Sequence, residues 1–261
     1  MDTNKRNLAI CVVADFKYLY KNFDRFFNQL VNNGKYYGDV LIITTKFCPT
    51  FLIKSIRKNK NVSVLKFKKI NFSNKTSKTL LNLSLGSNRH KYKNFQWHKL
   101  NLFNKKIKKW KYIFYLDINM HIHFDINDLL DIKPKNKILA RADGYPEYTW
   151  ALNSQFDVNH ELFPQLEKNF NLEITNYFQT GLLFFDTNIV KENTLDEIKF
   201  LVEKYPISIT NEQGILNLYF IFLYDKYEEL VKTINGQITY FYWLIDNEDV
   251  KITKATTTRN K

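Results

Sequence analysis

The chain has 261 residues, of which 44% are hydrophobic and 16% aromatic, with only 7 Gly and 5 Pro. This composition excludes a disordered or low-complexity protein, and the length suits one α/β domain. The formal net charge of +13 is compatible with a nucleic-acid partner, but Arg supplies only six of the 39 basic residues. Because bidentate phosphate recognition prefers Arg, we interpret the Lys as solvated surface and expect no nucleic-acid partner.

The first half of the chain alternates strand and helix patterns. Residues 8–14 are a continuous apolar run, typical of a central strand, and residues 17–32 repeat apolar side chains at helical spacing. Residues 70–90 are polar without clear periodicity, and we expect either a mobile functional loop or a helix that the pattern does not reveal. The other expected elements are strands at 39–45 and 62–67, a short helix after Pro49, and a helix over 92–109.

A buried strand at residues 112–117 leads to the first chemical motif. It is apolar or aromatic until Asp117 ends it, as expected of a strand covered on both faces. Ligand sites in open α/β sheets lie beyond the carboxyl ends of the strands. On an extended chain Asp117 and Asn119 point the same way and can share a hard divalent cation. A polar turn that holds no metal is the competing interpretation.

Fewer elements are clear in the second half. Residues 125–130 predict a short capped helix, and residues 177–186 predict a polar hinge followed by a buried strand. Residues 145–175 mix aromatic and polar side chains and receive no assignment. The other expected elements are a strand at 137–140, helices at 192–205 and 211–224, and late strands at 237–243 and 250–253.

Location follows from cysteine usage and hydropathy. Cys11 and Cys48 lie in apolar runs, which is typical of buried thiols in a reducing compartment. No signal-type apolar stretch precedes the first expected strand, and the most apolar window, residues 218–224, is too short to span a bilayer. We expect a cytoplasmic protein without a transmembrane segment, in the host cytoplasm if a virus encodes it.

Short motifs between residues 8 and 220 carry a resemblance to a known family. They are the turn at residues 13–18, Trp97-His98-Lys99-Leu100, the acidic stretch 114–122 with residues 126–130 downstream, Tyr177-Phe178-Gln179-Thr180-Gly181-Leu182-Leu183, and Glu212-Gln213-Gly214-Ile215-Leu216-Asn217. In this order they resemble the GT-A-fold nucleotide-sugar glycosyltransferases. The match is to the family-eight type, which includes glycogenin and the bacterial lipopolysaccharide galactosyltransferases.

The resemblance implies an α/β, GT-A fold: a Rossmann-like mixed, mostly parallel sheet flanked by helices. It implies one domain over residues 1–261, with a nucleotide-binding half (1–130) and a sugar and acceptor half (131–261). The implied enzyme is a hexosyltransferase that uses Mn²⁺ or Mg²⁺ and a nucleotide-sugar donor, with a UDP-sugar favoured. It would transfer the sugar to a hydroxyl of a glycan, protein or lipid acceptor, with retention of anomeric configuration. The donor sugar, the acceptor and the oligomeric state stay open.

The resemblance also implies roles for individual residues. Asp117 and Asn119 would bind the metal. Gln179, Glu212 and Gln213 would position sugar and acceptor as the catalytic group, and an inverting enzyme would need a base such as Glu212 or Asp143. The implied donor-binding residues are Val13, Ala14, Asp15, Tyr18, Lys99, Leu116, Asp117, Ile118, Asn119, Asp143 and Lys254.

Each assignment has a structural alternative. Tyr18 could simply pack on the first helix, and Lys99 could be one more solvated lysine. Gln213 and Asn217 are four residues apart and could form a polar helix face.

Three departures from the family pattern leave other functions open. Asn119 replaces the second carboxylate of the acidic motif, and Glu212 replaces an Asp. The late His-x-x-Gly-x-x-Lys-Pro-Trp element is absent, and Lys254 or Asp246 could replace its Lys and its metal ligand. A catalytically weakened nucleotide-sugar-binding protein is therefore the main alternative. A sugar nucleotidyltransferase usually needs a Gly-rich loop, and residues 14–20 contain no Gly.

Overall fold

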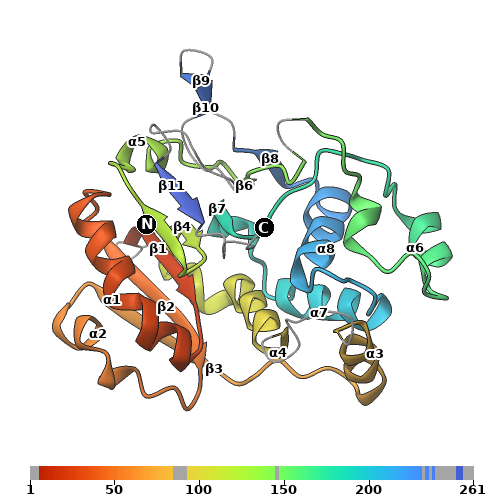
Figure 1. The fold of residues 1–261 in the computed structure, drawn as a ribbon, viewed down its shortest axis with the longest axis horizontal. Coiled ribbons are helices and arrows are strands. Elements are labelled where there is room, and N and C mark those ends of the chain that lie inside the picture. Colours follow the sequence, from red (N-terminus) through yellow and green to blue (C-terminus); the bar gives the residue numbers. More distant parts are fainter. Residues whose placement is uncertain are drawn as a thin grey trace, which may run out of the picture.

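A mixed sheet of seven strands forms the centre of the protein (Figure 1). The structure is a computed structural model that describes residues 6–84, 93–144, 147–230, 233–234, 237–238 and 251–254. The strand order is β3-β2-β1-β4-β7-β6-β8. These strands are β1 (Arg6–Val13), β2 (Asp39–Thr45), β3 (Val62–Phe67), β4 (Trp110–Leu116), β6 (Ile138–Ala140), β7 (Leu182–Asp186) and β8 (Tyr227–Glu229).

Strand direction divides the sheet at β4. On one side β3, β2, β1 and β4 are all parallel, which brings the carboxyl ends of β1, β2 and β4 to one edge. On the other side β7 runs antiparallel to both β4 and β6, and β8 runs parallel to β6. The expected mixed, mostly parallel α/β sheet is confirmed.

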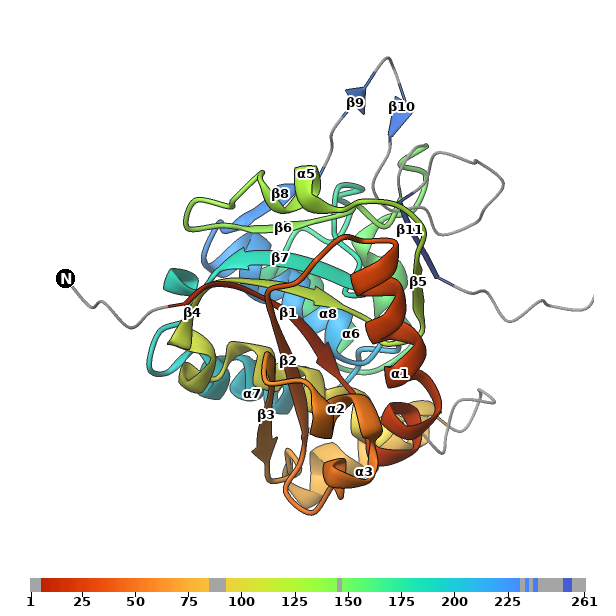
Figure 2. The same cartoon turned by 90° about the vertical axis from the view of Figure 1, so that its left-hand side faces the viewer.

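Helices cover both faces of this sheet (Figure 2). One face packs against α1 and α5, and the other packs against η3, α6, α7 and α8. The α-helices are α1 (Phe16–Asn32), α2 (Lys54–Lys58), α3 (Asn74–Ser84), α4 (Lys93–Gln96), α5 (Asn127–Leu130), α6 (Phe163–Asn169), α7 (Thr194–Lys204) and α8 (Glu212–Asn217). The 3₁₀ turns are η1 (Thr50–Leu52), η3 (Trp97–Phe103), η4 (Lys105–Lys109), η5 (Leu152–Gln155) and η6 (Thr187–Ile189), and η7 (Leu218–Leu223) is a π-helix.

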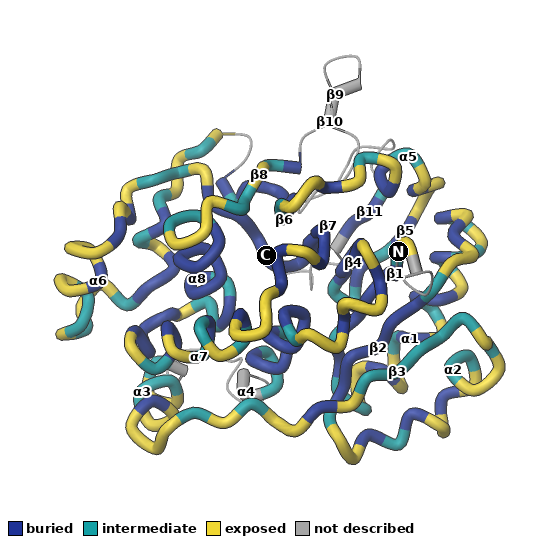
Figure 3. Tube along the Cα trace, turned by 180° about the vertical axis from the view of Figure 1, so that it is seen from behind, coloured by how far each residue is buried: buried dark blue, intermediate teal, exposed yellow. Residues whose placement is uncertain are grey.

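The central position of β4 in the sheet explains why apolar and polar residues do not alternate along it. Tyr112 and Phe114 pack into the core on the α1 face, whereas Ile113 and Tyr115 pack into the core on the opposite face. All four side chains are buried, because both faces are covered. Figure 3 shows the same burial along the neighbouring strands, with exposed residues gathered on the outer turns.

Helix α1 begins where a polar residue caps it. The Asp15 carboxylate accepts a hydrogen bond from the Tyr18 backbone N–H at 2.8 Å, satisfying one of the first free N–H groups of the helix. The helix then buries an apolar stripe and ends at Asn33. Gly34 follows because a Cβ there would lie 2.8 Å from the Leu30 carbonyl oxygen.

Several segments differ from the sequence expectation. The helix expected over 92–109 is a short α4 followed by 3₁₀ turns η3 and η4, interrupted at Asn104. The helix over 211–224 changes from α to π at Leu218. The unassigned stretches contain α3, η5 and α6. Of the expected strand 237–243, residues 239–243 lie outside the described part of the chain.

The chain turns after β4, contrary to the expected extended course. The Met120 N–H donates to the Asp117 carbonyl at 2.9 Å, closing a tight turn over Ile118 and Asn119. It then forms β5 (Met120–Ile122), which pairs antiparallel with β11 (Ile252–Lys254). A separate two-stranded pair consists of β9 (Thr233–Ile234) and β10 (Gln237–Ile238).

Two further sequence observations can be compared with the structure. Cys11 and Cys48 are both buried and unpaired, as expected, although Cys48 lies in the turn after β2 rather than in a strand. Among the described residues, no helix has the length and apolar character needed to cross a bilayer.

Candidate active site

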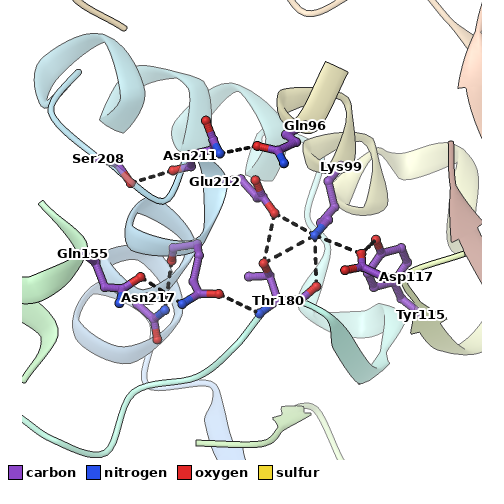
Figure 4. Close-up of polar contacts among 11 residues, drawn as sticks. Gln96, Lys99, Tyr115, Asp117, Gln155, Thr180, Ser208, Asn211, Glu212 and Asn217 are labelled. Atoms are coloured by element: carbon purple, nitrogen blue, oxygen red, sulfur yellow. Dashed lines mark hydrogen bonds and ion pairs between the residues drawn. The ribbon is translucent and has the colours of Figure 1, made fainter. Parts of the chain in front are cut away.

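A mostly covered group of charged side chains lies at the carboxyl end of β4, in which Glu212 is buried and Lys99 and Asp117 are partly buried (Figure 4). We call Lys99, Tyr115, Asp117, Thr180 and Glu212 the ionic cluster. Lys99 Nζ lies 2.7 Å from Glu212 Oε1 and 3.4 Å from Asp117 Oδ1. It also donates a hydrogen bond to the Thr180 carbonyl oxygen at 3.1 Å. Segments that are up to 113 residues apart in sequence thus meet around one ammonium group.

Hydroxyl groups complete the ionic cluster. The Tyr115 hydroxyl donates to Asp117 Oδ1 at 2.5 Å, and the Thr180 hydroxyl donates to Glu212 Oε1 at 3.0 Å. Tyr115 is buried beneath the site, and Lys99 Nζ lies 5.3 Å from its ring centroid. Each carboxylate therefore faces both the ammonium group and a hydroxyl donor, which fixes its orientation.

Electrostatics keep the ammonium group charged. Burial lowers the pKa of Lys99, but the neighbouring Asp117 and Glu212 carboxylates outweigh burial and raise that pKa above its ordinary value. Burial, reinforced by Asp117, also raises the pKa of the Tyr115 hydroxyl well above its usual range. Tyr115 is therefore a neutral hydrogen-bond donor. Lys99 is therefore not a solvated surface lysine.

An array of side-chain amides adjoins the ionic cluster. We call Gln155, Gln213, Asp143 and Tyr177 the amide cluster. Gln213 Nε2 donates to Gln155 Oε1 at 2.9 Å and to Asp143 Oδ2 at 3.2 Å. Gln155 Nε2 donates to the same carboxylate oxygen at 3.3 Å and to the Tyr177 hydroxyl at 3.3 Å. Both N–H donors of Gln213 are thereby committed, and its oxygen accepts from the Thr180 backbone N–H at 3.2 Å.

Asn217 anchors helix α8, which carries Glu212 and Gln213. Its side chain accepts from the Phe178 N–H at 2.8 Å and donates to the Phe178 carbonyl at 2.9 Å, as a neighbouring strand would. Asn217 is completely buried. Gln213 and Asn217 are therefore not a solvent-facing polar stripe, because both side chains bind neighbouring segments.

The turn that starts α8 has unusual backbone geometry. Asn211 has φ 59° and ψ −121°, a conformation that favours glycine. Its carbonyl accepts from the Ser208 hydroxyl at 2.6 Å, and its side-chain amide donates to Gln96. These contacts join α8 to the end of α4, next to Lys99. Strain of this kind is commonly retained at functional sites.

The turn after β1 lies at the same edge of the sheet. Cys11 pairs with Tyr115 in the parallel register, which brings Val13 level with Asp117. The Ala14 N–H bonds the Ile43 carbonyl at 3.1 Å. One oxygen of Asp15 is already used as the cap of α1, so it is held in a defined position. Tyr18 is 38% exposed on the first turn of that helix, so its side chain reaches the surface.

The remaining expected residues fall at the same edge or near it. Leu116 and Ile118 are buried on either side of Asp117, while Asn119 is half-buried in the turn. Lys254 lies opposite Met120 in the β5–β11 pair, and Met120 is the residue that follows Asn119. Asp246 is outside the described residues.

Gln179 brings a buried oxygen without a partner. Its backbone N–H donates to the Arg141 carbonyl at 3.0 Å, and the side chain is 4% exposed. Oε1 has no hydrogen-bond partner among the described residues. Buried polar atoms are normally satisfied, so this oxygen needs a donor from another group.

Comparison with known proteins places the fold. No family profile and no curated protein sequence matches the chain. The galactosyltransferase LgtC, in complex with donor and acceptor sugar analogues, superposes with a TM-score of 0.63 and 12% identity, over 94% of this chain and 86% of LgtC. The chain has the GT-A glycosyltransferase fold.

Other solved structures with this GT-A fold act on different sugars. The mannosyltransferase Ktr4p from S. cerevisiae gives a TM-score of 0.54 at 12% identity, covering 87% of this chain and 69% of Ktr4p. Mouse xyloside xylosyltransferase 1 gives 0.51 at 10% identity, covering 97% of this chain and 98% of that protein. At such low identity the likeness concerns the fold, and any function must be argued from the site.

Asp117 and Asn119, which the sequence analysis assigns to a divalent cation, lie in the turn after β4. Asp117 supplies a carboxylate and Asn119 an amide, the oxygen donors that Mg²⁺ and Mn²⁺ prefer. The described residues contain no group of three His, Cys, Asp or Glu placed to hold a metal. The donor set therefore fits a cation that is also held by a ligand's phosphates and by water.

Sequence reasoning did not assign a role to Tyr115, Thr180, Gln155 or Tyr177. Tyr115 precedes Asp117 by two residues on a strand, and this spacing was a usable signal for a side chain on the same face. Thr180 lies inside a quoted motif. Gln155 comes from the unassigned stretch 145–175, and no local pattern distinguishes it.

Proposed function

We propose that the protein is a glycosyltransferase that moves a hexose from a nucleoside-diphosphate sugar, with a UDP-sugar favoured, to an acceptor hydroxyl. The ionic cluster carries this proposal. Lys99, Asp117 and Glu212 come from three separate motifs and converge at the carboxyl edge of a GT-A sheet. A ligand site is expected at that edge of an open α/β sheet.

The chemistry requires stabilisation of negative charge on a departing diphosphate. A divalent cation held by Asp117 and Asn119 would supply part of that stabilisation when bound. Lys99 pairs with both Asp117 and Glu212, so these three side chains together keep one excess negative charge, which attracts a cation, and the ammonium group holds the two carboxylates in position. Its two carboxylate partners hold the ammonium group in place without a large reorganisation.

Gln213 and Gln179 are assigned to orientation of the sugar. Both N–H donors of Gln213 are used by the amide cluster, so its carbonyl oxygen points towards Thr180 and the ionic cluster. The unpartnered Oε1 of Gln179 suits a sugar hydroxyl as donor. Glu212 Oε1 already faces Lys99 and Thr180, so we assign Glu212 to positioning and propose retention of configuration.

The test is a panel of UDP- and GDP-sugars with Mn²⁺, Mg²⁺ or EDTA, read by thermal shift and by release of nucleotide. We expect a UDP-sugar to raise the melting temperature in the presence of Mn²⁺, and Asp117→Ala to abolish the shift. Asp131→Ala is the matched control, because Asp131 is an exposed carboxylate on the surface. No response to any nucleotide sugar would refute the proposal, and NMR of the product anomer tests retention.

Asn119 favours a second candidate, a protein that binds nucleotide sugars without efficient transfer. The amide lacks the charge of a second carboxylate and so weakens attraction for a cation. A thermal shift without nucleotide release, for every sugar and acceptor supplied, would support this alternative over the transferase.

A further inference from the structure

The turn after β2 exposes three large apolar side chains. Phe47 is 88% exposed, Phe51 is 65% exposed and Leu52 is 55% exposed, all within six residues. Exposed apolar groups of this size are unremarkable when scattered singly, but a contiguous group commonly marks an interaction site. We call residues 46–58 the aromatic loop.

The aromatic loop is firmly attached to the protein. Cys48, Thr50 and Ile53 are buried and alternate with the exposed apolar residues. Backbone hydrogen bonds run from Cys48 to Thr45 and from Ile53 to Thr50, both at 3.1 Å. Lys66 Nζ also donates to the Cys48 carbonyl at 2.6 Å. The exposed side chains are therefore presented on a turn that is fixed to the protein by buried residues and hydrogen bonds.

Basic residues neighbour the exposed apolar residues in sequence. Residues 46–60 contain five Lys or Arg and no Asp or Glu. Lys46, Lys54, Arg57 and Lys58 are all exposed. Lys46 Nζ lies 5.7 Å from the ring centroid of Phe47, so charge and aromatic surface are immediate neighbours.

We propose that the aromatic loop docks on an anionic lipid surface, with its apolar side chains inserted at the headgroup boundary. Aromatic and aliphatic side chains flanked by Lys and Arg suit such a boundary, because the apolar groups enter it while the basic groups attract anionic headgroups. The basic residues of the loop favour an anionic partner. A nucleic acid would use the basic groups but gain little from Leu52, and three apolar side chains are too few for a stable protein interface.

The loop lies at the same sheet edge as the ionic cluster. It follows β2, and Val13 at the end of the parallel neighbour β1 pairs with Ile43 of β2. Docking would therefore bring the edge that carries Asp117 towards the lipid surface. This consequence rests on the proposed function, and it implies an acceptor that is held at a membrane. The lipid binding itself does not depend on transferase activity.

Vesicle co-sedimentation tests the proposal on the whole chain without nucleotide sugar. We expect binding to phosphatidylcholine vesicles containing phosphatidylglycerol, and weak binding to phosphatidylcholine alone. The variant Phe47→Ser/Phe51→Ser/Leu52→Ser keeps every charge and should reduce the partition coefficient by about tenfold or more. Phe200→Ser is the matched control, because Phe200 is also 65% exposed but lies on α7; it should bind like the parent chain.

Two further measurements distinguish insertion of the aromatic loop from general attraction to polyanions. Lys54→Glu/Arg57→Glu should weaken binding and reduce its dependence on salt, since each basic side chain near an anionic surface contributes a factor of about five. Tryptophan fluorescence of Phe47→Trp should shift to the blue and be quenched by brominated lipid. Undiminished binding by the triple variant, or no quenching, would overturn the proposal and leave general attraction to polyanions.

Thermal-shift measurements distinguish a loss of lipid binding from a loss of folding or of donor binding. The triple variant changes only exposed side chains, so its melting temperature and its donor-induced thermal shift should match those of the parent chain. If the parent chain binds vesicles but no nucleotide sugar, the lipid proposal stands and the proposed function fails. If the parent chain forms a stable dimer through this loop instead, sedimentation velocity of the triple variant will show a monomer and the lipid proposal fails.

Discussion

The ionic cluster and the amide cluster lie side by side at one edge of the sheet, yet they are constructed on different principles. In the first, one ammonium group pairs with two carboxylates and leaves one negative charge in excess, so its main requirement is charge. In the second, the neutral amides of Gln155 and Gln213 donate to one carboxylate oxygen of Asp143, so its main requirement is the orientation of the hydrogen-bond donors. A change in the first should therefore affect folding, and a change in the second should affect the geometry of a bound ligand.

Thr180 connects the two clusters. Its hydroxyl and carbonyl oxygen face Glu212 and Lys99, whereas its N–H bonds Gln213 Oε1. Gln213 therefore has one orientation. Its N–H groups donate within the amide cluster, and its oxygen accepts from Thr180 of the ionic cluster.

The largest effect is expected from Lys99→Met. It leaves the Asp117 and Glu212 carboxylates without their buried cation, which typically costs about 3–5 kcal/mol of unfolding free energy. Urea unfolding followed by circular dichroism measures this loss. Lys105→Met is the control, because Lys105 forms an exposed pair with Glu192, and such a pair contributes about 0–1 kcal/mol. Equal stability of the two variants would contradict the conclusion that the two carboxylates depend on Lys99.

Gln155→Leu should spare much of the stability and lower the rate. It leaves Gln213 Nε2 with one acceptor and removes a donor from Asp143, so the carboxamide of Gln213 loses its fixed direction. The lost hydrogen bonds cost about 1–3 kcal/mol of unfolding free energy, less than the loss expected for Lys99→Met. Misalignment of Gln213 should lower kcat by about tenfold to a hundredfold. KM for the donor should change little, because the ionic cluster is intact.

The variant Gln155→Glu sharpens the same prediction. It keeps an acceptor for Gln213 but places a second carboxyl oxygen beside Asp143 in place of a donor. We expect kcat to recover as the pH falls and the pair takes up a proton. A flat pH profile, or equal damage to kcat and stability in both variants, would assign Gln155 a purely structural role.

Asn119→Asp should strengthen metal binding by about tenfold, since cation affinity follows the charge of the ligand set. The midpoint of the donor-induced thermal shift in a Mn²⁺ titration measures this change. Asn104→Asp adds the same charge at the start of η4, away from the acidic turn, and should leave the midpoint unchanged. An unchanged midpoint in Asn119→Asp would mean that the turn directs residue 119 away from the cation.

The smallest effect is a dependence of stability on alkaline pH. The pKa of Lys99 in the folded chain lies above its ordinary value of 10.5, because the carboxylates outweigh burial. Its contribution is therefore complete below pH 10.5 and is lost as the pH rises through the folded-state pKa. The difference in unfolding free energy between the parent chain and Lys99→Met should be constant in the neutral range and shrink only in strong alkali.

The parallel half of the sheet could be predicted because its signals are local. The runs at β1, β2 and β4 are continuously apolar, since helices cover both faces, and each ends at a polar residue. The stretches around α3 and α6 could not be assigned, because they are mostly polar and contribute few buried side chains to a periodic pattern. Tertiary packing, rather than local preference, stabilises such elements.

The sequence by itself determined the fold class, the position of the acidic motif at the end of β4 and the candidate residues Lys99, Asp117 and Glu212, because apolar runs and short motifs are local properties. Only the tertiary structure decided that Lys99 is buried between two carboxylates and that Gln155 directs Gln213. It also turned the chain at Asp117, where an extended course was expected. Contacts between segments up to about a hundred residues apart depend on how strands pair and helices pack, and no local pattern encodes them.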